Sequence, residues 1–444
     1  MAAPAARLRD RGHDIRCLDL STEAWDPLLA DWADRVAISV TMHTAMRIAR
    51  EAIAAIREHR ADVPVCCYGL YAETMPDVAD RVLAGETDTA LVHWIESDGE
   101  RGSADRRAST RFLGRDAAQT GSPVPARDLL PPLDHYVHLT FGSELSAPSV
   151  PVAYVEASHG CAHRCRHCPV PVVYDGRIRI VAADDVLADI EQQVGAGARH
   201  ATFGDPDFLN GVHHSLRVVR SMHERWPDLT WDCTTKVEHI IRHEDLWGEL
   251  AELGCLFVVS AFESTNDEML ERLDKAHTVD DAARAVALLR RHGIEVRPSW
   301  LPFTPWTTLT DIQQLLEFVA EHDLIENVDP VQYTIRLLLP PGSLLLGDPS
   351  LPPFLDGYDT ERCTYAWHSL DPSIDDLQRE LATLVEAETA GGATIGQIYD
   401  AVRVRCGLPP LAVDGSVEAR PRLTESWFCC AEPTSGQLGR FVSQ

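Results

Sequence analysis

The chain has 444 residues, of which 45% are hydrophobic and 24% are charged, as in ordinary globular proteins. This composition excludes wholesale disorder, and the net charge of −28 disfavours a dedicated nucleic-acid binder. No apolar run is long enough to span a bilayer, and the chain does not open with the apolar stretch of a signal peptide. We therefore expect a cytoplasmic protein with no membrane or nucleic-acid partner.

Residues 1–115 predict an α/β domain, because strand and helix patterns alternate along them. Apolar runs at 35–40 and 63–68 are long enough for buried parallel strands, and an amphipathic helix lies between them at 45–60. Further strands are predicted at 13–20 and 87–92. This order favours a doubly wound parallel sheet. Since the chain opens inside a helical pattern, we expect the first strand of such a sheet to be missing.

Residues 116–149 contain Pro-rich segments and are predicted to be a linker. Alternation resumes over 150–345, with strands expected at 153–157, 200–203, 230–233, 256–261, 295–299 and 331–338, and helices at 184–193, 239–253, 279–292 and 309–322. Six such repeats predict a partial or complete barrel of the (β/α)6 type. Residues 346–444 are expected to form a mostly helical C-terminal extension, with a helix at 374–388.

Three of the twelve cysteines, Cys161, Cys165 and Cys168, follow the first barrel strand at C-x3-C-x2-C spacing. Active sites of barrels lie at this end of the strands, and three thiolates there suit a soft metal centre. A [4Fe–4S] cluster held by three cysteines leaves one iron open to another ligand. The alternative from the same residues is a zinc site completed by a neighbouring histidine, His159, His163 or His167.

The cysteine triplet, with the ring-bearing His167 before its last cysteine, resembles the signature of the radical S-adenosylmethionine (SAM) superfamily. The resemblance implies that the amino and carboxylate groups of SAM chelate the open iron. It also implies that one electron cleaves a C–S bond of SAM, usually giving a 5′-deoxyadenosyl radical that takes a hydrogen atom from the substrate. An electron donor of the flavodoxin or ferredoxin type is then expected as a partner.

The resemblance extends along residues 150–345 to the ends of later strands. The loop with Gly204, Asp205 and Asp207 looks like the Phe-x-Asp-x-x-Phe form found in the cobalamin-linked subclass, and implies contacts with SAM. Lys236 resembles the basic residue that pairs with the methionine carboxylate, and Glu263 the carboxylate that binds ribose hydroxyls. The ordinary alternatives are an acidic turn, a surface lysine and a carboxylate near a helix start.

The N-terminal domain resembles the cobalamin-binding domain that precedes many such barrels. The Asp-x-His-x-x-Gly motif of that domain is absent, and Tyr68-Gly69-Leu70 stands where a Gly-Gly turn is usual. Two alternatives therefore remain open, which are cobalamin binding and a degenerate domain that caps the barrel and shapes the substrate pocket. In either case His43 is a candidate contact to cofactor or substrate.

Adjacent cysteines, Cys429 and Cys430, lie in a segment that resembles the radical SAM group named for its Cys-Cys-Ala-Glu-Pro tail. A disulfide between neighbouring residues is strained, whereas vicinal thiols bind thiophilic centres and undergo redox reactions. The resemblance implies that Cys430 is a chemically active position. The alternative is a tail whose cysteines are incidental.

These residues predict a radical SAM enzyme acting on an unidentified small-molecule or peptide substrate, with the vicinal cysteines taking part. Two alternatives remain open. One is transfer of the aminocarboxypropyl group of SAM to a soft acceptor. The other is a non-catalytic iron–sulfur or thiophilic-metal binding protein.

Overall fold

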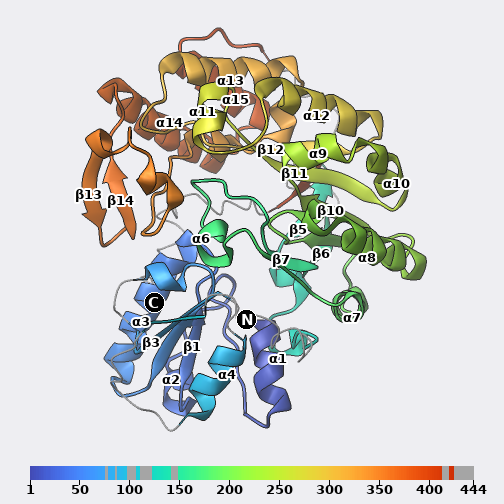
Figure 1. The fold of residues 1–444 in the computed structure, drawn as a ribbon, viewed down its shortest axis with the longest axis vertical. Helices are drawn as coiled ribbons and strands as arrows, with labels where there is room; N and C mark the ends of the chain where they lie inside the picture. Colours follow the sequence, from blue (N-terminus) through green and yellow to red (C-terminus); the bar gives the residue numbers. More distant parts are fainter. Residues whose placement is uncertain are drawn as a thin grey trace.

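The structure, a computed structural model, describes residues 1–75, 79–85, 88–97, 107–110, 123–141, 149–412 and 420–424. It has a mixed α/β fold with two main sheets. The N-terminal sheet lies at the bottom of Figure 1, and the barrel sheet and the C-terminal helices lie above it. Within this described part, none of the helices combines the length and apolar character that crossing a membrane requires.

The N-terminal sheet contains four parallel strands in chain order, β1 (Val36–Ser39), β2 (Val65–Tyr68), β3 (Arg81–Gly85) and β4 (Arg107–Thr110). Helix α3 (His43–His59) covers one face, and α1 (Ala2–Asp10) and α4 (Asp88–Glu96) cover the other. Alternation along β2 explains this, because Cys67 packs on the α3 side and Cys66 on the α4 side. The order of the described strands does not reverse. The predicted doubly wound arrangement is therefore seen only in the helices on both faces.

Two predicted strands of this region are wrong. Residues 13–20 are an extended segment outside the sheet, because Ile15 and Cys17 pack beside the loop with Ala126 and no described strand pairs with them. Residues 88–92 begin α4, whose Leu91 and Val92 pack on the sheet. A short helix, α2 (Pro27–Trp32), precedes β1.

The barrel sheet has seven strands in the order β12 (Glu295–Trp300), β11 (Cys255–Glu263), β10 (Thr230–Thr234), β9 (His200–Phe203), β6 (Ser149–Val155), β5 (His138–Phe141) and β15 (Pro421–Leu423). The first five are parallel, which confirms five of the six predicted barrel strands. Strand β5 lies inside the predicted linker and pairs antiparallel with β6, so the linker prediction is wrong there.

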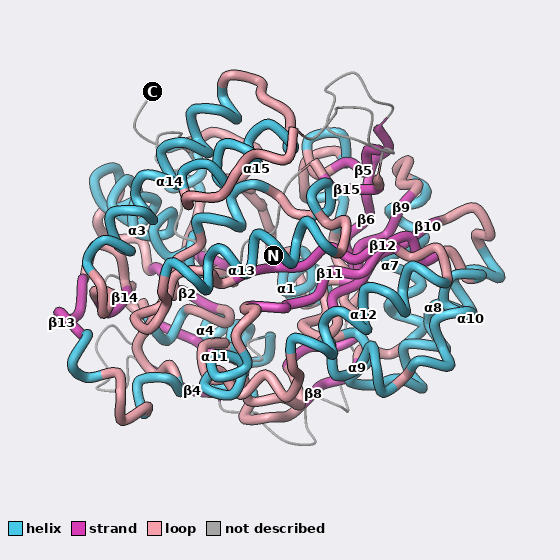
Figure 2. The backbone as a smooth tube through the Cα atoms, turned by 90° about the horizontal axis from the view of Figure 1, so that it is seen from above, coloured by secondary structure: helices cyan, strands magenta, loops and turns pink. Residues whose placement is uncertain are grey.

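Helices pack along the outer side of the parallel strands, as Figure 2 shows for α7, α8, α10 and α12. In chain order they are α7 (Ala183–Gly195), α8 (Val212–Arg225), α9 (Val237–Arg242), α10 (Trp247–Glu252), α12 (Val279–Arg291) and α13 (Leu309–Glu321). The helix predicted at 239–253 is divided into α9 and α10 by the turn Glu244–Leu246. The core between sheet and helices contains large buried side chains such as Phe203, Trp231 and Trp247.

The predicted sixth barrel strand at 331–338 is wrong. Pro330–Thr334 forms a 3-10 turn, and only Arg336 makes a parallel bridge, to Phe303. Strand β15 fills the gap instead. The Arg297 side chain donates to the Pro421 carbonyl oxygen at 3.4 Å, and Arg422 donates to Asp329 at 2.9 Å. The two edges of the sheet are thereby joined, and the partial barrel is nearly closed.

The C-terminal region contains the helices α14 (Pro372–Ala390) and α15 (Ile395–Arg405), of which α14 was predicted. It is not simply helical, because β13 (Leu355–Asp359) and β14 (Thr364–Trp367) form an unpredicted antiparallel hairpin. Cys363 precedes β14 and is buried in the core of the N-terminal sheet, while Arg50 of α3 donates to the carbonyl of Thr360. The hairpin therefore ties the C-terminal region to the N-terminal sheet.

Candidate active site at the carboxyl edge of the barrel sheet

The three cysteines lie in a loop between two short strands. After β6 the chain forms β7 (Ser158–Gly160), passes Cys161, Cys165 and Cys168, and returns through α6 (Val170–Tyr174) to β8 (Ile178–Ile180), which pairs antiparallel with β7. Gly160 has φ +78°, and a Cβ atom there would lie 2.4 Å from the carbonyl oxygen of Arg177. Only glycine fits directly before Cys161.

The three cysteines lie on a loop that is anchored to the rest of the barrel. Cys161 and Cys165 are buried and Cys168 is half-buried, and none of the described cysteines forms a disulfide. The backbone N–H of Arg166 donates to Leu273 at 2.9 Å, so the loop is held against the segment that follows β11. Burial and, more weakly, the nearby Asp207 carboxylate raise the pKa of the Cys161 thiol. A metal centre would relieve this cost, since it binds thiolates.

Asp205 and Gly204 shape the turn that leads into the cysteine loop. Asp205 is fully buried, and its carboxylate accepts from the Ala157 N–H at 2.9 Å and from the Ser158 hydroxyl at 2.5 Å. Burial raises its pKa to about 7. At Gly204 a Cβ would lie 2.1 Å from the Tyr154 hydroxyl oxygen, so glycine gives room to that side chain. Both residues therefore support the turn in this structure.

Glu263 is the centre of a buried charged cluster beside the cysteines. It ends β11 with φ +64°, and its Oε1 lies 3.0 Å from His167 Nε2 and 3.1 Å from Lys275 Nζ. Burial alone would raise the pKa of Glu263, but the Lys275 ammonium and the His167 imidazole hold it well below its usual range. The carboxylate is therefore ionised and can only accept hydrogen bonds. Burial alone would lower the pKa of Lys275, but Glu263 and, in addition, the thiols of Cys165 and Cys168 raise it.

Two further basic groups complete this cluster. Lys236 is buried at the start of α9, with Nζ 3.7 Å from a carboxylate oxygen of Glu238. His277 is buried, and its ring nitrogens make no hydrogen bond to another side chain. Burial, and then the charges of Lys275 and Lys236, lower the pKa of His277 to about 4. Buried nitrogens without a side-chain partner, beside two ammonium groups, fit a site for the anionic part of a ligand.

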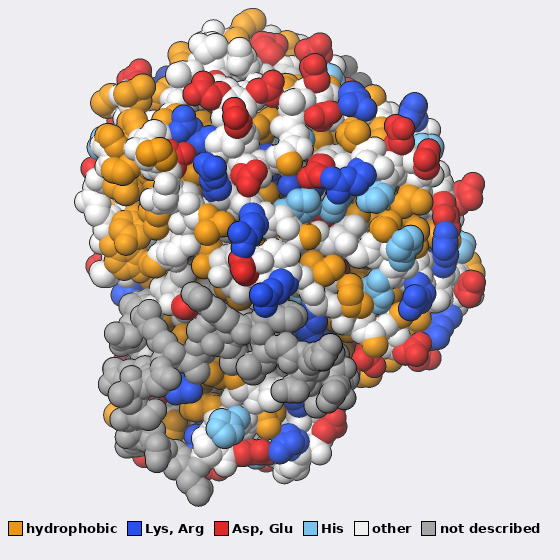
Figure 3. All heavy atoms as spheres, in the orientation of Figure 1, with side chains coloured by type: hydrophobic (Ala, Val, Ile, Leu, Met, Phe, Trp, Pro, Cys, Tyr) orange, Lys and Arg blue, Asp and Glu red, His pale blue; other side chains and the backbone are white. Residues whose placement is uncertain are grey.

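A second polar cluster was not predicted as a unit. Asp207, in the loop after β9, places Oδ2 3.5 Å from His163 Nε2 and 2.9 Å from His239 Nδ1. Burial alone would raise the pKa of Asp207, but the two imidazoles hold it below its usual range. His239 was missed, although its place in the first turn after a barrel strand is a usable signal. Histidine side chains gather on the face over α9 and β10 in Figure 3.

The histidines that a zinc–cysteine site would use face other groups. His163 faces Asp207, His167 faces Glu263, and His159 lies 3.6 Å from Glu156. This arrangement favours the cluster interpretation of the cysteine triplet over zinc bound by the same cysteines.

His43 lies at the start of α3, fully buried, with its ring edge-to-face to Tyr71 at 6.3 Å between centroids. Tyr71 and His167 line a cavity of only about 10 Å³ where the N-terminal sheet meets the cysteine loop. A corrin ring would require the two parts to move apart there. The other predicted residues, Cys429 and Cys430, lie outside the described residues.

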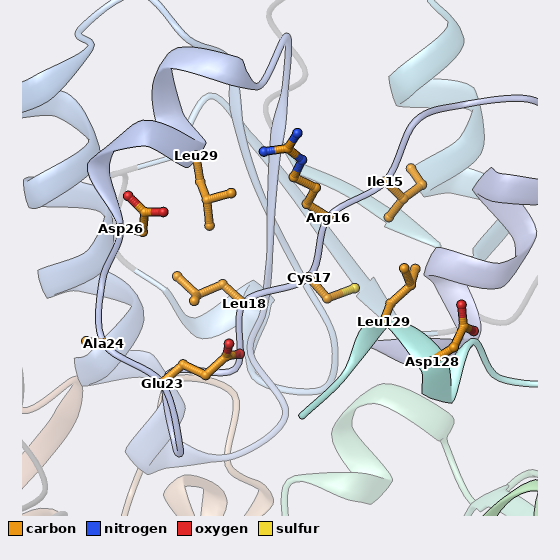
Figure 4. A pocket seen from close by; sticks show the side chains of 10 residues that line it. All are labelled: Ile15, Arg16, Cys17, Leu18, Glu23, Ala24, Asp26, Leu29, Asp128 and Leu129. Carbon is orange, nitrogen blue, oxygen red and sulfur yellow. The ribbon is translucent and has the colours of Figure 1, made fainter. Parts of the chain in front are cut away.

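A larger hollow, of about 680 Å³, lies within the N-terminal region and contains none of the predicted site residues. Figure 4 shows Leu18 of the extended segment pointing toward Leu29 and Asp26, and Cys17 pointing the other way, toward Leu129. It is open to solvent, and its lining has no converging buried polar groups.

Comparison with known proteins agrees with this geometry. Residues 155–319 match the model of the radical SAM superfamily, which implies a [4Fe–4S] cluster and SAM as cofactors. An uncharacterized methyltransferase of Pyrococcus horikoshii is 23% identical over 219 residues, 49% of this chain and 44% of the relative. The ribosomal protein uS12 methylthiotransferase RimO of Pelotomaculum thermopropionicum is 24% identical over 233 residues, 48% of each chain. This chain therefore spans about half the length of these relatives.

Two solved structures share the fold at low identity. The radical SAM methyltransferase TsrM from Kitasatospora setae, with tryptophan and a SAM analogue bound, has a TM-score of 0.56 at 18% identity, covering 78% of this chain and 71% of its own. The cobalamin-dependent radical SAM enzyme OxsB, with aqua-cobalamin bound, has a TM-score of 0.67 at 13% identity, covering 87% and 64%.

Proposed function

We propose that this chain, whose residues 155–319 belong to the radical SAM superfamily, is an enzyme that cleaves SAM reductively to start chemistry on a small-molecule or peptide substrate. One observation carries the proposal. The buried Glu263–His167–Lys275 cluster lies beside a glycine-shaped loop with three cysteines that form no disulfide, at the carboxyl edge of the barrel sheet. A [4Fe–4S] cluster on those cysteines supplies the electron for the cleavage.

The residues of this edge divide the work of holding SAM. Cys161, Cys165 and Cys168 hold three irons. Lys236, Lys275 and His277 face the anionic carboxylate of the methionine part. Glu263, kept ionised, accepts hydrogen bonds from ribose hydroxyls.

Three other predicted residues support these ligands. Asp205 and Gly204 act through the turn before the cysteines, since both oxygens of Asp205 are engaged there. His167 holds Glu263 in place. These three are positioning residues under this proposal.

The relatives favour group transfer as the reaction class. Those reported above are named a methyltransferase and a methylthiotransferase, and the solved neighbours include a methyltransferase. We extend this class to the present chain and expect a flavodoxin- or ferredoxin-type donor in the cytoplasm to supply electrons. Aminocarboxypropyl transfer remains the second candidate, because it would use the same site and cleave a different C–S bond.

Cobalamin is treated separately, because the described residues do not fit it as they stand. The fold is that of neighbours described with cobalamin bound, but the cavity beside His167 and Tyr71 is smaller than the corrin ring by far. We assign no step of the reaction to cobalamin.

We extend the proposal to Cys429 and Cys430 on the direction and reach of β15. Leu423 pairs with Leu139, which pairs with Val150 near the start of β6. Two antiparallel pairings make β15 run in the same direction as β6, toward the cysteine loop. The distance along β6 from Val150 to Val155 is roughly 17 Å, and the six residues from Leu423 to Cys429 can span about 20 Å. On this ground we propose that Cys429 and Cys430, which lie outside the described residues, take part in the reaction.

The proposal is tested by anaerobic reconstitution with iron and sulfide, followed by incubation with SAM and a strong reductant. Mass spectrometry distinguishes 5′-deoxyadenosine, S-adenosylhomocysteine and methylthioadenosine, which report radical chemistry, methyl transfer and aminocarboxypropyl transfer. We expect Cys165→Ala to lose cluster and products, and Cys17→Ala, which removes a half-buried thiol that packs in the N-terminal region, to keep both. An intact cluster that neither binds nor cleaves SAM would contradict the proposal.

A further inference from the structure

We propose that His163, Asp207 and His239 form a second metal site, which binds a divalent transition-metal ion of the zinc or ferrous class next to the cysteine loop. The three ligand atoms, His163 Nε2, Asp207 Oδ2 and His239 Nδ1, lie within 4.8 Å of one another. Two imidazoles and one carboxylate are a ligand set that such ions use. This inference does not depend on the proposed SAM chemistry.

The spacing of the ligand atoms suits one ion between them. Metal–ligand distances of about 2.1 Å place neighbouring ligand atoms roughly 3.0 Å apart in octahedral and 3.4 Å apart in tetrahedral geometry. The distances from Asp207 Oδ2, 2.9 Å to His239 Nδ1 and 3.5 Å to His163 Nε2, bracket those values.

The same three atoms face one another and no other hydrogen-bonding group. Each is buried, and none has a hydrogen-bond partner, although Asp207 Oδ2 and His239 Nδ1 are only 2.9 Å apart. In a metal site each lone pair points at the ion and not at the neighbouring ligand, so close contacts without hydrogen-bond geometry are expected. Three orphaned buried polar atoms aimed at one another would otherwise be costly.

Neighbouring groups orient these ligands as they do in known metal sites. The other oxygen of Asp207 accepts from the Thr235 hydroxyl at 2.8 Å and from the Leu209 N–H at 3.2 Å. The second ring nitrogen of His163 lies 3.6 Å from Glu238 Oε2. The remaining oxygen of Asp207 is therefore left facing the two imidazoles.

Three separate structural elements place the ligands on one edge. His163 comes from the cysteine loop, Asp207 from the loop after β9, and His239 from α9 after β10. The side chain of His163 is 15% exposed, whereas those of Asp207 and His239 are 0% and 6% exposed, so His163 is the member of the set nearest to solvent. Three protein ligands leave a position for water or a substrate atom, as in catalytic zinc sites.

The test is metal analysis of the reconstituted holoenzyme after removal of loosely bound ions. Zn²⁺ and ⁵⁷Fe²⁺ are supplied in separate samples, and metals are counted per chain. We expect one equivalent of Zn²⁺ beyond the cluster iron, or one ferrous ion whose Mössbauer signal differs from that of the cluster. His239→Gln should lose this equivalent and keep the cluster iron, and His243→Gln, on the next turn and outside the ligand set, should keep both.

X-ray absorption at the zinc edge identifies the atoms that bind the zinc ion. It therefore distinguishes zinc at the proposed site from zinc bound by the cysteine loop, and it does not depend on a variant that could fail to fold. Zinc at this site shows only nitrogen and oxygen neighbours at about 2.0–2.1 Å, whereas zinc on cysteines shows sulfur at about 2.3 Å. Sulfur neighbours, retention of the ion by His239→Gln, or a wild-type chain that takes up neither ion would each overturn the proposal.

Discussion

Replacing Lys275 with methionine should destabilise the protein strongly, because the buried Glu263 carboxylate then loses the ammonium group that balances its charge. Lys275 is 2% exposed, and its ammonium lies 3.1 Å from Glu263 Oε1, which is itself buried. Methionine keeps most of the side-chain volume, so that packing around the site changes little. The change therefore tests the charge and not the shape.

The expected loss of stability is estimated from the Lys275–Glu263 pair and from His167, which contacts the same carboxylate. Removing one partner of a buried ion pair costs about 3–5 kcal/mol. His167 Nε2 remains 3.0 Å from the same Glu263 oxygen, so we expect a loss near the lower end, about 3 kcal/mol. At roughly 2 °C per kcal/mol for a large domain, the melting temperature should fall by about 6 °C.

The assay is thermal unfolding by circular dichroism under anaerobic conditions, with a double-mutant cycle. Glu263→Gln removes the charge that Lys275 compensates, so the double variant should recover most of the stability that Lys275→Met loses. SAM binding should stay weak in the double variant, because both contacts are gone. A Lys275→Met protein that melts within 1–2 °C of the wild type, on the same scale, would refute the stabilising role of the pair.

Three further predictions concern other parts of the molecule. Gly160→Ala should lower the iron and sulfide bound per chain severalfold, because the new Cβ would lie 2.4 Å from the Arg177 carbonyl oxygen. Gly197→Ala is the control for backbone strain alone, since Gly197 has φ +111° but no atom within 4 Å of an added Cβ. Burial raises the pKa of Asp205 to about 7, above its unfolded value of about 4. The free energy of unfolding should therefore fall as the pH rises from about 4 to about 7, because the unfolded chain releases this proton first. Urea unfolding of Asp205→Asn should lack this pH dependence. Arg50→Ala removes the donor to the Thr360 carbonyl and should speed limited proteolysis of the β13–β14 hairpin; unchanged cleavage would show that the buried Cys363 holds the hairpin alone.

Local sequence patterns were sufficient to predict the strands and helices that form through their own periodicity. The five parallel barrel strands and helices such as α12 and α13 follow from apolar periodicity and, at both helices, from capping boxes at their starts. The pattern at 331–338 is equally apolar, but Pro330 and the turn after it prevent a strand. Strands β5 and β15 were missed because short segments become strands only through their partners, which lie far away in the sequence.

The candidate site divides in the same way. The cysteine spacing and Glu263 were recognisable as a pattern along the chain, and the structure brings them to one edge with Lys275 and His167. The sequence did not show which of the polar side chains form hydrogen bonds with one another. Asp205 looked free to bind a ligand, yet the adjacency of β6 and β9 engages both of its oxygens. Such pairings depend on neighbouring strands and not on sequence distance.

Closure of the barrel by β15 has a consequence for biosynthesis. The backbone N–H of His138, the first residue of β5, donates to the Thr424 side chain, 286 residues later in the chain. At roughly 5–20 residues per second, about 15–60 s of translation separates the two segments. During that interval the outer edge of β5 has no strand partner while β6 can already form. The nascent chain thus carries an open strand edge that invites intermolecular pairing, so slow translation or chaperone depletion should lower the soluble yield of this protein.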